Sequence, residues 1–373
     1  MRIFQITQSF YPVMGGIETY IDNLSTKLSL RGNDLYVITR FFPSKSKNTR
    51  KLKYKVIRLK EIKFLEKLKF KNFPHFYRSV YFYPLTKKLV SKLDPDVLHF
   101  HSRFYFTQAR LLKKPTIFTS HTPYFWYWKK IFIRKYFLDS FDIILCLTKR
   151  LLNMVNKISS SRAVYLPHGI DTKRFSPNLD RNVIRLRHNI SKDEKIILCL
   201  GRMVFYKGYH IMIKSMLYIL EKNKKVKLII VGSGPLLNEL KSLAIKYNLQ
   251  NNVIFAGRVE DEFIPLYYAG CDIFVHPALK AEYSPRVIFE ALASGKPIIS
   301  TYSGGVVEII KNFQNGVLIK PNDPKKLSET ILNLLSNSKL LQKLSSSALQ
   351  SALNEYSWDI IINKYLEIVK SIL

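Results

Sequence analysis

The sequence lacks a long hydrophobic run. No stretch approaches the roughly 20 apolar residues that a membrane-spanning helix needs. Residues 1–7 are too short and too interrupted to form the core of a signal peptide. We therefore expect a cytoplasmic protein, whose contact with a membrane would be peripheral, at the inner face.

Cysteine is also scarce. The three cysteines, Cys146, Cys199 and Cys271, stand far apart, and each lies in or beside an apolar run. This placement favours small buried side chains over metal ligands or a disulfide framework. We expect reduced, structural thiols.

Acidic residues are few. The chain has 60 Lys and Arg against 27 Asp and Glu, which gives a net charge of +33. This charge attracts anionic partners, and nucleic acid, anionic lipid and a phosphorylated substrate all fit. In residues 51–55 and 60–71 the cations alternate with apolar and aromatic residues. Such segments can lie in a bilayer interface, where each cation contributes about 1 kcal/mol. A solvated lysine-rich face is an equally good interpretation.

Length and pattern indicate an α/β protein with two domains. A chain of 373 residues with 47% hydrophobic residues has enough material for two cores. Strand-like runs alternate with helical patterns, which is typical of parallel sheets with crossover helices. We expect a first domain at residues 1–180 and a second at 181–356. A last helix at 357–373 would pack back on the first domain.

The expected elements form two series around a polar linker at residues 175–191. The first series has a helix at 17–30 and strands at 3–9, 35–39, 97–100, 116–120, 143–147 and 163–166. Strands of the second series are expected at 195–200, 227–231, 253–255, 273–276 and 297–300. Several of these strands run into Gly or Pro. Because ligands of open α/β sheets lie beyond the carboxyl ends of the strands, this edge is the expected site.

The clearest candidate site runs from Glu282 to Glu290. Ser284 is a good helix cap and Pro285 a good first helical residue, so we expect a helix from there to about Gly295. Glu282 would precede this helix, and Glu290 within it can accept two hydrogen bonds from a vicinal diol such as a ribose. The helix N terminus between them suits a phosphate. By itself the pair is weak evidence, because Glu282 could be an ordinary acidic residue of a loop and Glu290 an ordinary solvated residue of a helix.

Two cations follow the first strand of the second series. Arg202 and Lys207 are framed by Gly201 and Gly208. A diphosphate leaving group gains negative charge as the sugar bond breaks, and fixed cations stabilise that charge most in the transition state. The framing glycines favour this interpretation over two unrelated surface cations.

These motifs, in their order, resemble the retaining glycosyltransferases of family 4, which have two facing Rossmann-like domains with a cleft between them (the GT-B fold). The resemblance spans nearly the whole chain. Its first-half motifs are Gly15-Gly16-Ile17-Glu18, Ser120-His121-Thr122 and Pro167-His168-Gly169-Ile170-Asp171. Its second-half motifs are Gly201-Arg202 with Lys207-Gly208, Val231-Gly232-Ser233-Gly234-Pro235, Phe255-Ala256-Gly257-Arg258-Val259, Glu282 with Glu290, Ser303-Gly304-Gly305 and Asn315-Gly316-Val317-Leu318.

The resemblance implies roles for the second domain, which would bind the donor. Glu282 would contact the donor sugar and Glu290 the ribose. Arg202 and Lys207 would contact the diphosphate, and the backbone near Val259 the base.

For the first domain, the resemblance implies that Gly16 lets its loop approach the phosphates, because it lacks a side chain. His121 would lie near the sugar, although a histidine after a strand is by itself more often a hydrogen-bonded structural residue. Pro285 stands where family members often have glycine, and it removes one backbone donor from the sugar-binding loop. The expected catalytic set is therefore His121, Arg202, Lys207 and Glu282, and the helix start adds Ser284, Arg286 and Val287 to the donor-binding set.

The resemblance also implies the reaction. Such enzymes transfer a sugar, here a hexosyl group from a UDP- or GDP-linked donor, and the leaving phosphate helps to deprotonate the acceptor on the same face. The family needs no metal for this chemistry. Asp94-Pro95-Asp96 superficially resembles an Asp-x-Asp metal site, but its place before the strand at 97–100 favours a loop turn. We expect no metal and no cofactor.

The acceptor is suggested by weaker signals. The aromatic run at residues 124–128, beside Lys129 and Lys130, would suit a lipid carrier or sugar rings, although packing within a helix is the default. We expect the first domain to bind a lipid-linked or glycan acceptor. A nucleotide-sugar epimerase of the same fold is one alternative. A basic nucleic-acid-binding protein is the other, but no recognised motif for that function is present.

Overall fold

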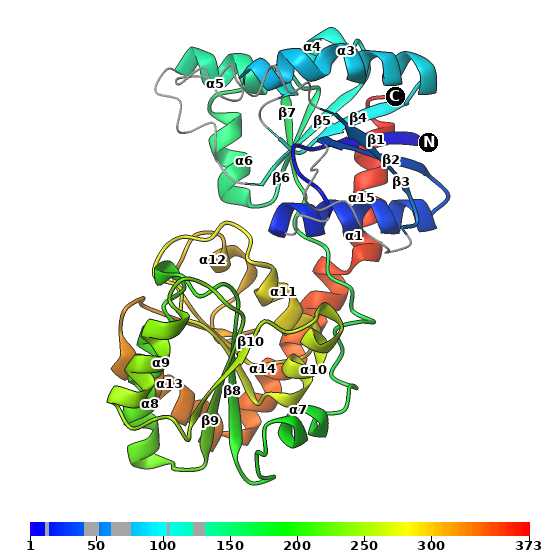
Figure 1. The fold of residues 1–373 in the computed structure, drawn as a ribbon. Coiled ribbons are helices and arrows are strands. Elements are labelled where there is room, and N and C mark those ends of the chain that lie inside the picture. Colours follow the sequence, from blue (N-terminus) through cyan, green and yellow to red (C-terminus); the bar gives the residue numbers. More distant parts are fainter. Residues whose placement is uncertain (12–14, 41–51, 61–75, 103–104, 122–130) are drawn as a thin grey trace. The chain divides into compact units, whose positions relative to one another are not determined.

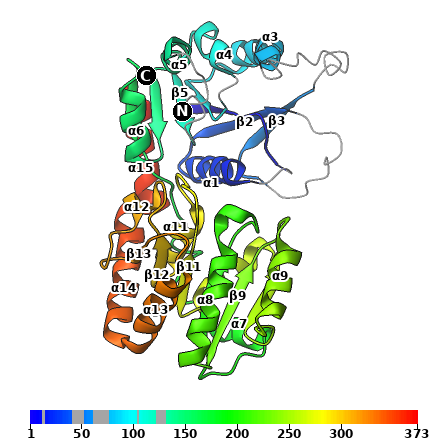
Figure 2. The ribbon, with the colours of Figure 1, turned by 90° about the vertical axis from the view of Figure 1, so that its left-hand side faces the viewer.

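The computed structural model describes residues 1–11, 15–40, 52–60, 76–102, 105–121 and 131–373. The chain divides into two compact units (Figures 1 and 2). Unit 1 comprises Met1–Pro167 and Ile361–Leu373, and unit 2 comprises His168–Ile360. The aromatic run at 124–128 with its two lysines, residue 51 of the first basic segment and residues 61–71 of the second lie outside the described residues.

Unit 1 is built on a parallel sheet with seven described strands, in the order β3-β2-β1-β4-β5-β6-β7. β1 pairs with β2 on one side and with β4 on the other, so the direction of the crossovers reverses at this point. In Rossmann-like sheets, ligands bind at such a switch point. The strands are β1 (Arg2–Ile6), β2 (Asp34–Arg40), β3 (Lys55–Leu59), β4 (Val97–Phe100), β5 (Thr116–Ser120), β6 (Ile143–Cys146) and β7 (Arg162–Tyr165).

Helices cover both faces of the unit 1 sheet (Figure 1). One face packs Phe4 and Ile6 against side chains of α3 to α6. On the other face, Tyr365 of α15 reaches His99 of β4, with 3.0 Å between the tyrosine hydroxyl and Nδ1. The helices are α1 (Gly16–Leu30), α3 (Phe76–Leu93), α4 (Phe106–Leu111), α5 (Ile131–Leu138), α6 (Lys149–Asn156) and α15 (Trp358–Lys370), which enters unit 1 at Ile361.

Unit 2 repeats this architecture with six described strands, in the order β10-β9-β8-β11-β12-β13. The switch point lies between β8 and β11. The strands are β8 (Lys195–Leu200), β9 (Val226–Val231), β10 (Val253–Gly257), β11 (Ile273–His276), β12 (Ile298–Thr301) and β13 (Val317–Ile319). The helices are α7 (Asn182–Arg187), η4 (Phe205–Lys207), α8 (Tyr209–Lys222), α9 (Leu237–Lys246), η5 (Asp261–Phe263), α10 (Ile264–Gly270), α11 (Arg286–Ala293), α12 (Val306–Ile309), α13 (Pro324–Ser336), α14 (Ser338–Ser351) and η6 (Ala352–Tyr356).

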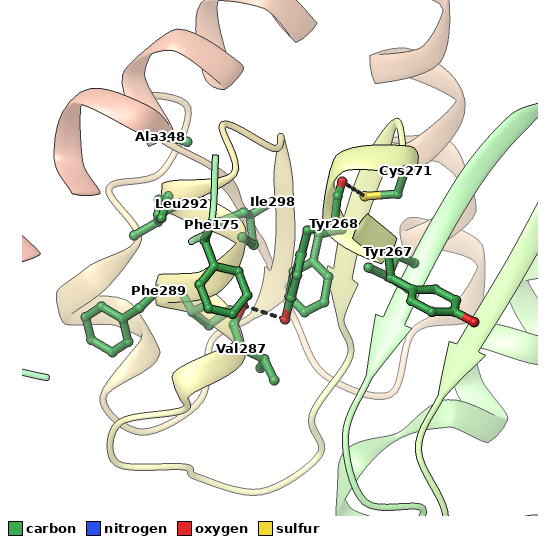
Figure 3. Close-up of a cluster of buried hydrophobic side chains, with 14 of the residues drawn as sticks. Phe175, Tyr267, Tyr268, Cys271, Val287, Phe289, Leu292, Ile298 and Ala348 are labelled. Carbon is green, nitrogen blue, oxygen red and sulfur yellow. Dashed lines mark hydrogen bonds between the residues drawn. The ribbon is translucent and has the colours of Figure 1, made fainter. Parts of the chain in front are cut away.

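Both faces of the unit 2 sheet are buried. Alternate residues of β8 enter opposite cores, with Ile196 and Leu198 on one face and Ile197 and Cys199 on the other. This double burial explains why the strands are continuous apolar runs. Figure 3 shows the first of these cores, where side chains of α10, α11 and β12 pack with Phe175.

The cysteines are free and buried, as expected. Burial raises the pKa of Cys146 and of Cys271 to about 12, so both stay protonated thiols at neutral pH. None of the described helices combines the length and the apolar character that a bilayer-spanning helix requires.

The structure differs from the expected organisation in the linker and at the sheet edges. The linker at 175–191 contains α7, and residues 168–180 group with unit 2 because Ile170 and Phe175 are buried in its core. The edge strands β3 and β13 were not expected. β3 is at most half-buried and contains two cations, and β13 is apolar and buried but has only three residues, so neither gives a long apolar run.

Substituting Gly169 with alanine tests a tight contact in unit 2. A Cβ at Gly169 would lie 2.4 Å from the indole ring of Trp358. We expect Gly169→Ala to lower the free energy of unfolding by about 1–3 kcal/mol through overpacking. Gly16→Ala is the control, because a Cβ there meets no described atom within 4 Å. Thermal unfolding of both variants measures the effect, and equal melting temperatures would contradict it.

Candidate active site

The predicted site in unit 2 forms at the switch point between β8 and β11. Gly208 has a left-handed backbone (φ 71°), and a Cβ there would lie 1.9 Å from the carbonyl oxygen of Pro277. Glycine therefore allows η4, which ends at Lys207, to lie against the end of β11. The amide of Leu279 donates to the carbonyl of Tyr206 (2.7 Å), which joins η4 to the loop after β11.

Glu282 lies in that loop and is held by two partners. Its Oε2 accepts a hydrogen bond from Nζ of Lys207 (2.7 Å), and its Oε1 lies 3.1 Å from Nε2 of His276. Burial alone would raise the pKa of Glu282. The hydrogen bonds and charges of His276 and Lys207 outweigh burial and lower this pKa to about 2. Glu282 is therefore a carboxylate at neutral pH.

His276 was not among the residues predicted for the site. Its ring is buried between Glu282 and Ser300 of β12, whose hydroxyl lies 3.1 Å from Nδ1. Because a carboxylate only accepts hydrogen bonds, Nε2 of His276 carries the proton in the contact with Glu282. The sequence held one signal for this role, a polar residue at the end of an apolar strand, directly before Pro277.

The Glu282 loop is also fixed through its backbone. The amide of Gly305 donates to the carbonyl oxygen of Glu282 (2.8 Å). Gly304 has a left-handed backbone (φ 54°), and a Cβ there would lie 2.3 Å from the same oxygen. The motif Ser303-Gly304-Gly305 therefore holds the backbone that carries Glu282.

The helix after Glu282 starts later than predicted. α11 begins at Arg286, and Pro285 is the extended N-cap residue (φ −71°, ψ 114°). A proline side chain offers no hydrogen-bond acceptor, so the N-cap position has no side-chain cap. The predicted cap, Ser284, is wrong: its buried Oγ has no hydrogen-bond partner within the described residues.

Glu290 is a buried carboxylate, not a solvated helix residue. It is 3% exposed. Its Oε1 accepts from a guanidinium nitrogen of Arg286 (2.8 Å), and its Oε2 accepts from the hydroxyl of Tyr268 (3.0 Å). The same hydroxyl lies 3.2 Å from the carbonyl oxygen of Val287, a contact drawn in Figure 3. Burial and the nearby Glu290 charge raise the pKa of Tyr268, so it stays a donor. Sequence analysis missed Tyr268, which lies on another helix.

The remaining predicted residues of unit 2 lie near the strand ends. Arg202 is exposed two residues after the end of β8, and its guanidinium forms no ion pair within the described part of the chain. Val259 follows β10 and packs, half-buried, against the core, and Val287 is buried at the start of α11. No hydrogen bond or ion pair joins Arg202 or Val259 to Glu282 or Glu290 among the described residues.

Gly16 and His121 belong to unit 1. Gly16 is the exposed first residue of α1. His121 directly follows β5 and is buried, with its Nε2 3.2 Å from Nδ1 of His101. Burial lowers the pKa of His121 to about 3, so this ring is neutral at pH 7. Across the described residues of both units, no group of three or more His, Cys, Asp or Glu is placed to hold a metal ion.

The paired state of Glu282 predicts a pH-dependent stability. Its pKa in the folded protein, about 2, lies below the ordinary 4.5, so its stabilisation is present above pH 4.5 and is lost as the pH falls towards 2. We expect Glu282→Gln to lower the free energy of unfolding by about 3 kcal/mol at pH 7 and by less at acidic pH. Urea unfolding at several pH values measures this difference. Glu221→Gln, an exposed site on α8, is the control, and a Glu282→Gln effect that does not change with pH would contradict the assignment.

Comparisons with known families cover most of both units. Residues 180–351 match the family Glycosyl transferases group 1, and residues 14–174 match Glycosyltransferase Family 4. An alpha-monoglucosyldiacylglycerol synthase of Streptococcus pneumoniae is 28% identical over 342 residues, which cover 85% of this chain and 75% of that protein. A GDP-mannose-dependent phosphatidylinositol monomannoside mannosyltransferase of Mycolicibacterium smegmatis is 28% identical over 53% of this chain and 54% of its own length.

Solved structures share the fold. A glycosyltransferase of Rickettsia africae has a TM-score of 0.81 at 21% identity, over 100% of this chain and 98% of that one. HepE of Anabaena, in complex with UDP, also has a TM-score of 0.81, at 19% identity over the whole of both chains. The chain therefore belongs to the family 4 glycosyltransferases and is a glycosyltransferase with the GT-B fold.

Proposed function

We propose that unit 2 binds a UDP- or GDP-linked sugar and that the enzyme transfers the sugar with retention of its anomeric configuration. The observation that carries this proposal is the paired group near the carboxyl ends of β8 and β11, in which the partly buried Glu282 contacts the buried Lys207 and His276. HepE has been solved with UDP-glucose, and the mycobacterial relative is named as GDP-mannose-dependent, which supports a nucleoside diphosphate donor.

The contacts support distinct roles for the two glutamates. Glu282 is ionised and only accepts, which suits hydroxyl groups of the donor sugar. Glu290 uses one lone pair on each oxygen for Arg286 and Tyr268, and each oxygen keeps a second lone pair for a hydroxyl of the ribose. His276 positions Glu282, and Tyr268 positions Glu290.

The cations act on the leaving group. Lys207 and Arg202 stabilise the negative charge of the departing diphosphate. The bond from the anomeric carbon to the phosphate oxygen breaks, the acceptor oxygen bonds to that carbon on the same face, and the acceptor proton passes to the leaving phosphate. The backbone near Val259 contacts the base. For Gly16, at the phosphates, and His121, at the sugar, the family resemblance supports the role. This chemistry needs neither a protein base nor a metal.

The acceptor is lipid-linked or a glycan, and we place the enzyme at the inner face of the membrane. The two relatives described above are named for diacylglycerol and phosphatidylinositol compounds. The helix α5 exposes three consecutive apolar side chains, Ile131 (63%), Phe132 (63%) and Ile133 (40%). Arg134 and Lys135 follow directly, so apolar and cationic groups lie together on this short helix, as membrane-interface helices require.

A screen of nucleotide sugars by thermal shift tests the donor site. We expect one UDP- or GDP-linked hexose to stabilise the wild type, and Glu290→Gln to weaken its binding roughly tenfold or more through loss of a charged acceptor. We also expect Arg202→Ala and Lys207→Ala to weaken donor binding, because each removes a cation proposed to contact the diphosphate. Lys222→Ala, at the exposed end of α8, is the control for these two variants. The donor-site assignment would be wrong if no nucleotide sugar stabilised the wild type. It would also be wrong if the best ligand shifted the melting temperature of Glu290→Gln as much as that of the wild type.

Product analysis with that donor tests the reaction. We expect sugar transfer only when the acceptor is present, a product with the anomeric configuration of the donor, and unchanged rates with a chelator. Nuclear magnetic resonance of the product gives its configuration. An inverted product would overturn retention. Nucleotide released without transfer would indicate the epimerase, and a rate that falls with chelator would contradict the metal-free mechanism.

Liposome flotation tests the membrane contact. We expect the wild type to float with anionic vesicles more than with neutral ones, and Ile131→Ser with Phe132→Ser to reduce flotation by removing the apolar contribution of α5. Leu186→Ser, on the exposed face of α7 in unit 2, is the matched control. If the wild type floats with neither vesicle, the membrane version of the proposal fails.

A further inference from the structure

Three buried histidines form a line at the carboxyl ends of β4 and β5 in unit 1. His99 lies on β4, His101 directly follows it, and His121 directly follows β5. None is more than 9% exposed. The ring centroids of His99 and His101 are 4.1 Å apart, and those of His101 and His121 are 5.4 Å apart. The proposed function uses only His121.

Burial keeps these rings neutral. It lowers the pKa of His121 to about 3 and the pKa values of His99 and His101 well below their ordinary value. A neutral imidazole carries one N–H, so one ring nitrogen donates and the other accepts. The partner of one nitrogen therefore decides where the proton of the ring lies.

Gln5, in the central strand β1, sets the direction of the hydrogen bonds. Its side-chain oxygen Oε1 lies 2.5 Å from Nε2 of His101. Because a carbonyl oxygen only accepts, Nε2 of His101 donates and its Nδ1 accepts. That Nδ1 lies 3.2 Å from Nε2 of His121, which must therefore carry the proton. Nδ1 of His121 is then an acceptor, and it makes no hydrogen bond to the described residues.

Aromatic side chains without charge pack against the three histidines. The ring of Tyr20, on α1, meets His101 and His121 edge-on, with centroids 5.9 Å and 5.1 Å away. His99 stacks on Tyr365 of α15, with centroids 5.4 Å apart. None of these contacts places a formal charge against His121. The position of its proton therefore follows from the hydrogen bonds with His101 and Gln5.

We propose that His101, oriented by Gln5, is a positioning residue that fixes His121 as the neutral tautomer with its proton on Nε2. His121 then accepts a hydrogen bond at Nδ1 and forms no ion pair. This inference rests on the proposed function, in which His121 contacts the donor sugar. A neutral His121 that accepts at Nδ1 favours a sugar with a hydroxyl group at that contact and disfavours a sugar with a carboxylate. His101 therefore influences donor specificity without touching the donor.

The tautomer can be measured on the full chain without any donor. Histidine labelled with ¹⁵N gives ring-nitrogen signals that separate protonated from unprotonated nitrogens, and His121→Gln assigns the signals of His121. We expect Nε2 of His121 to be protonated and Nδ1 unprotonated near neutral pH. A proton on Nδ1, as would follow if the Gln5 amide faced the other way, would overturn the proposal. So would protons on both nitrogens.

Substitutions of His101 separate positioning from simple packing. In His101→Asn the side-chain oxygen replaces the accepting Nδ1, so we expect His121 to keep its tautomer. In His101→Asp the acceptor is charged, so we expect a doubly protonated His121 at neutral pH. His188→Asp, the same substitution at a histidine of unit 2 whose Nε2 lies 3.0 Å from the Tyr267 hydroxyl, is the control and leaves His121 unchanged. If His101→Asp left His121 neutral, the proposal would be wrong.

Donor preference gives the functional test. With the nucleotide identified by the donor screen, kcat/KM is compared for the neutral hexose and for the corresponding uronate. We expect the preference for the neutral hexose to persist in His101→Asn and to fall roughly tenfold in His101→Asp, the effect of one charged hydrogen bond. An unchanged preference in His101→Asp would reject the specificity role. The ¹⁵N measurement needs no donor, so it tests the tautomer of His121 even if the proposed function is wrong. A failure of the proposed function would appear in the donor screen instead.

Discussion

The ionised carboxylate of Glu282, whose side chain is only 16% exposed, is the constraint on which the unit 2 site depends. A charge taken out of water is costly unless it is paired and hydrogen-bonded. Lys207 and His276 provide this pairing, and two glycines shape the backbone around it. The left-handed Gly208 brings η4 against Pro277, and Gly304 lets the next loop pass over the Glu282 carbonyl. Gly208 and Gly304 therefore permit the close backbone approaches that surround the Glu282 carboxylate.

Unit 1 solves the equivalent problem differently. Its switch point also buries polar side chains, but the line from His99 to His121 is neutral, and each described bond within it joins uncharged groups. In the neutral network of unit 1, each hydrogen bond constrains which atom donates in the next one. In the charged pair of unit 2, the partners act on each other through their charges. Within each unit, the polar groups sit where the crossovers reverse, because only there do neighbouring strand ends leave space that no crossover connection fills.

Sequence patterns predicted the strands in which nearly every residue is buried. Central strands are buried on both faces, so β8 and β11 are continuous apolar runs that the sequence reveals. The edge strands β7 and β10 were predicted as well, but β3 contains Lys55 and Arg58 and β13 has only three residues, so these two were missed. At the site, the motif residues Lys207, Glu282 and Glu290 could be selected by spacing. Tyr268 and His276 could not, because their importance comes from contacts across 22 and six positions, and such contacts exist only in the folded chain.

The charge of the site also differs from the charge of the chain. Lys207 pairs with Glu282 and Arg286 pairs with Glu290, so these four residues carry no net charge between them. Of the cations predicted to contact the diphosphate, Arg202 alone has no carboxylate partner among the described residues. An incoming diphosphate would therefore share Lys207 with Glu282. In the proposed reaction, the growing negative charge of the leaving group would draw Lys207 from Glu282 towards the phosphate, and the stabilisation by Lys207 would increase in the transition state. The excess of +33 therefore lies entirely outside this balanced group and includes Arg202. Apart from Arg202, whose proposed role is at the diphosphate, these cations bear on the attraction of anionic partners to the surface.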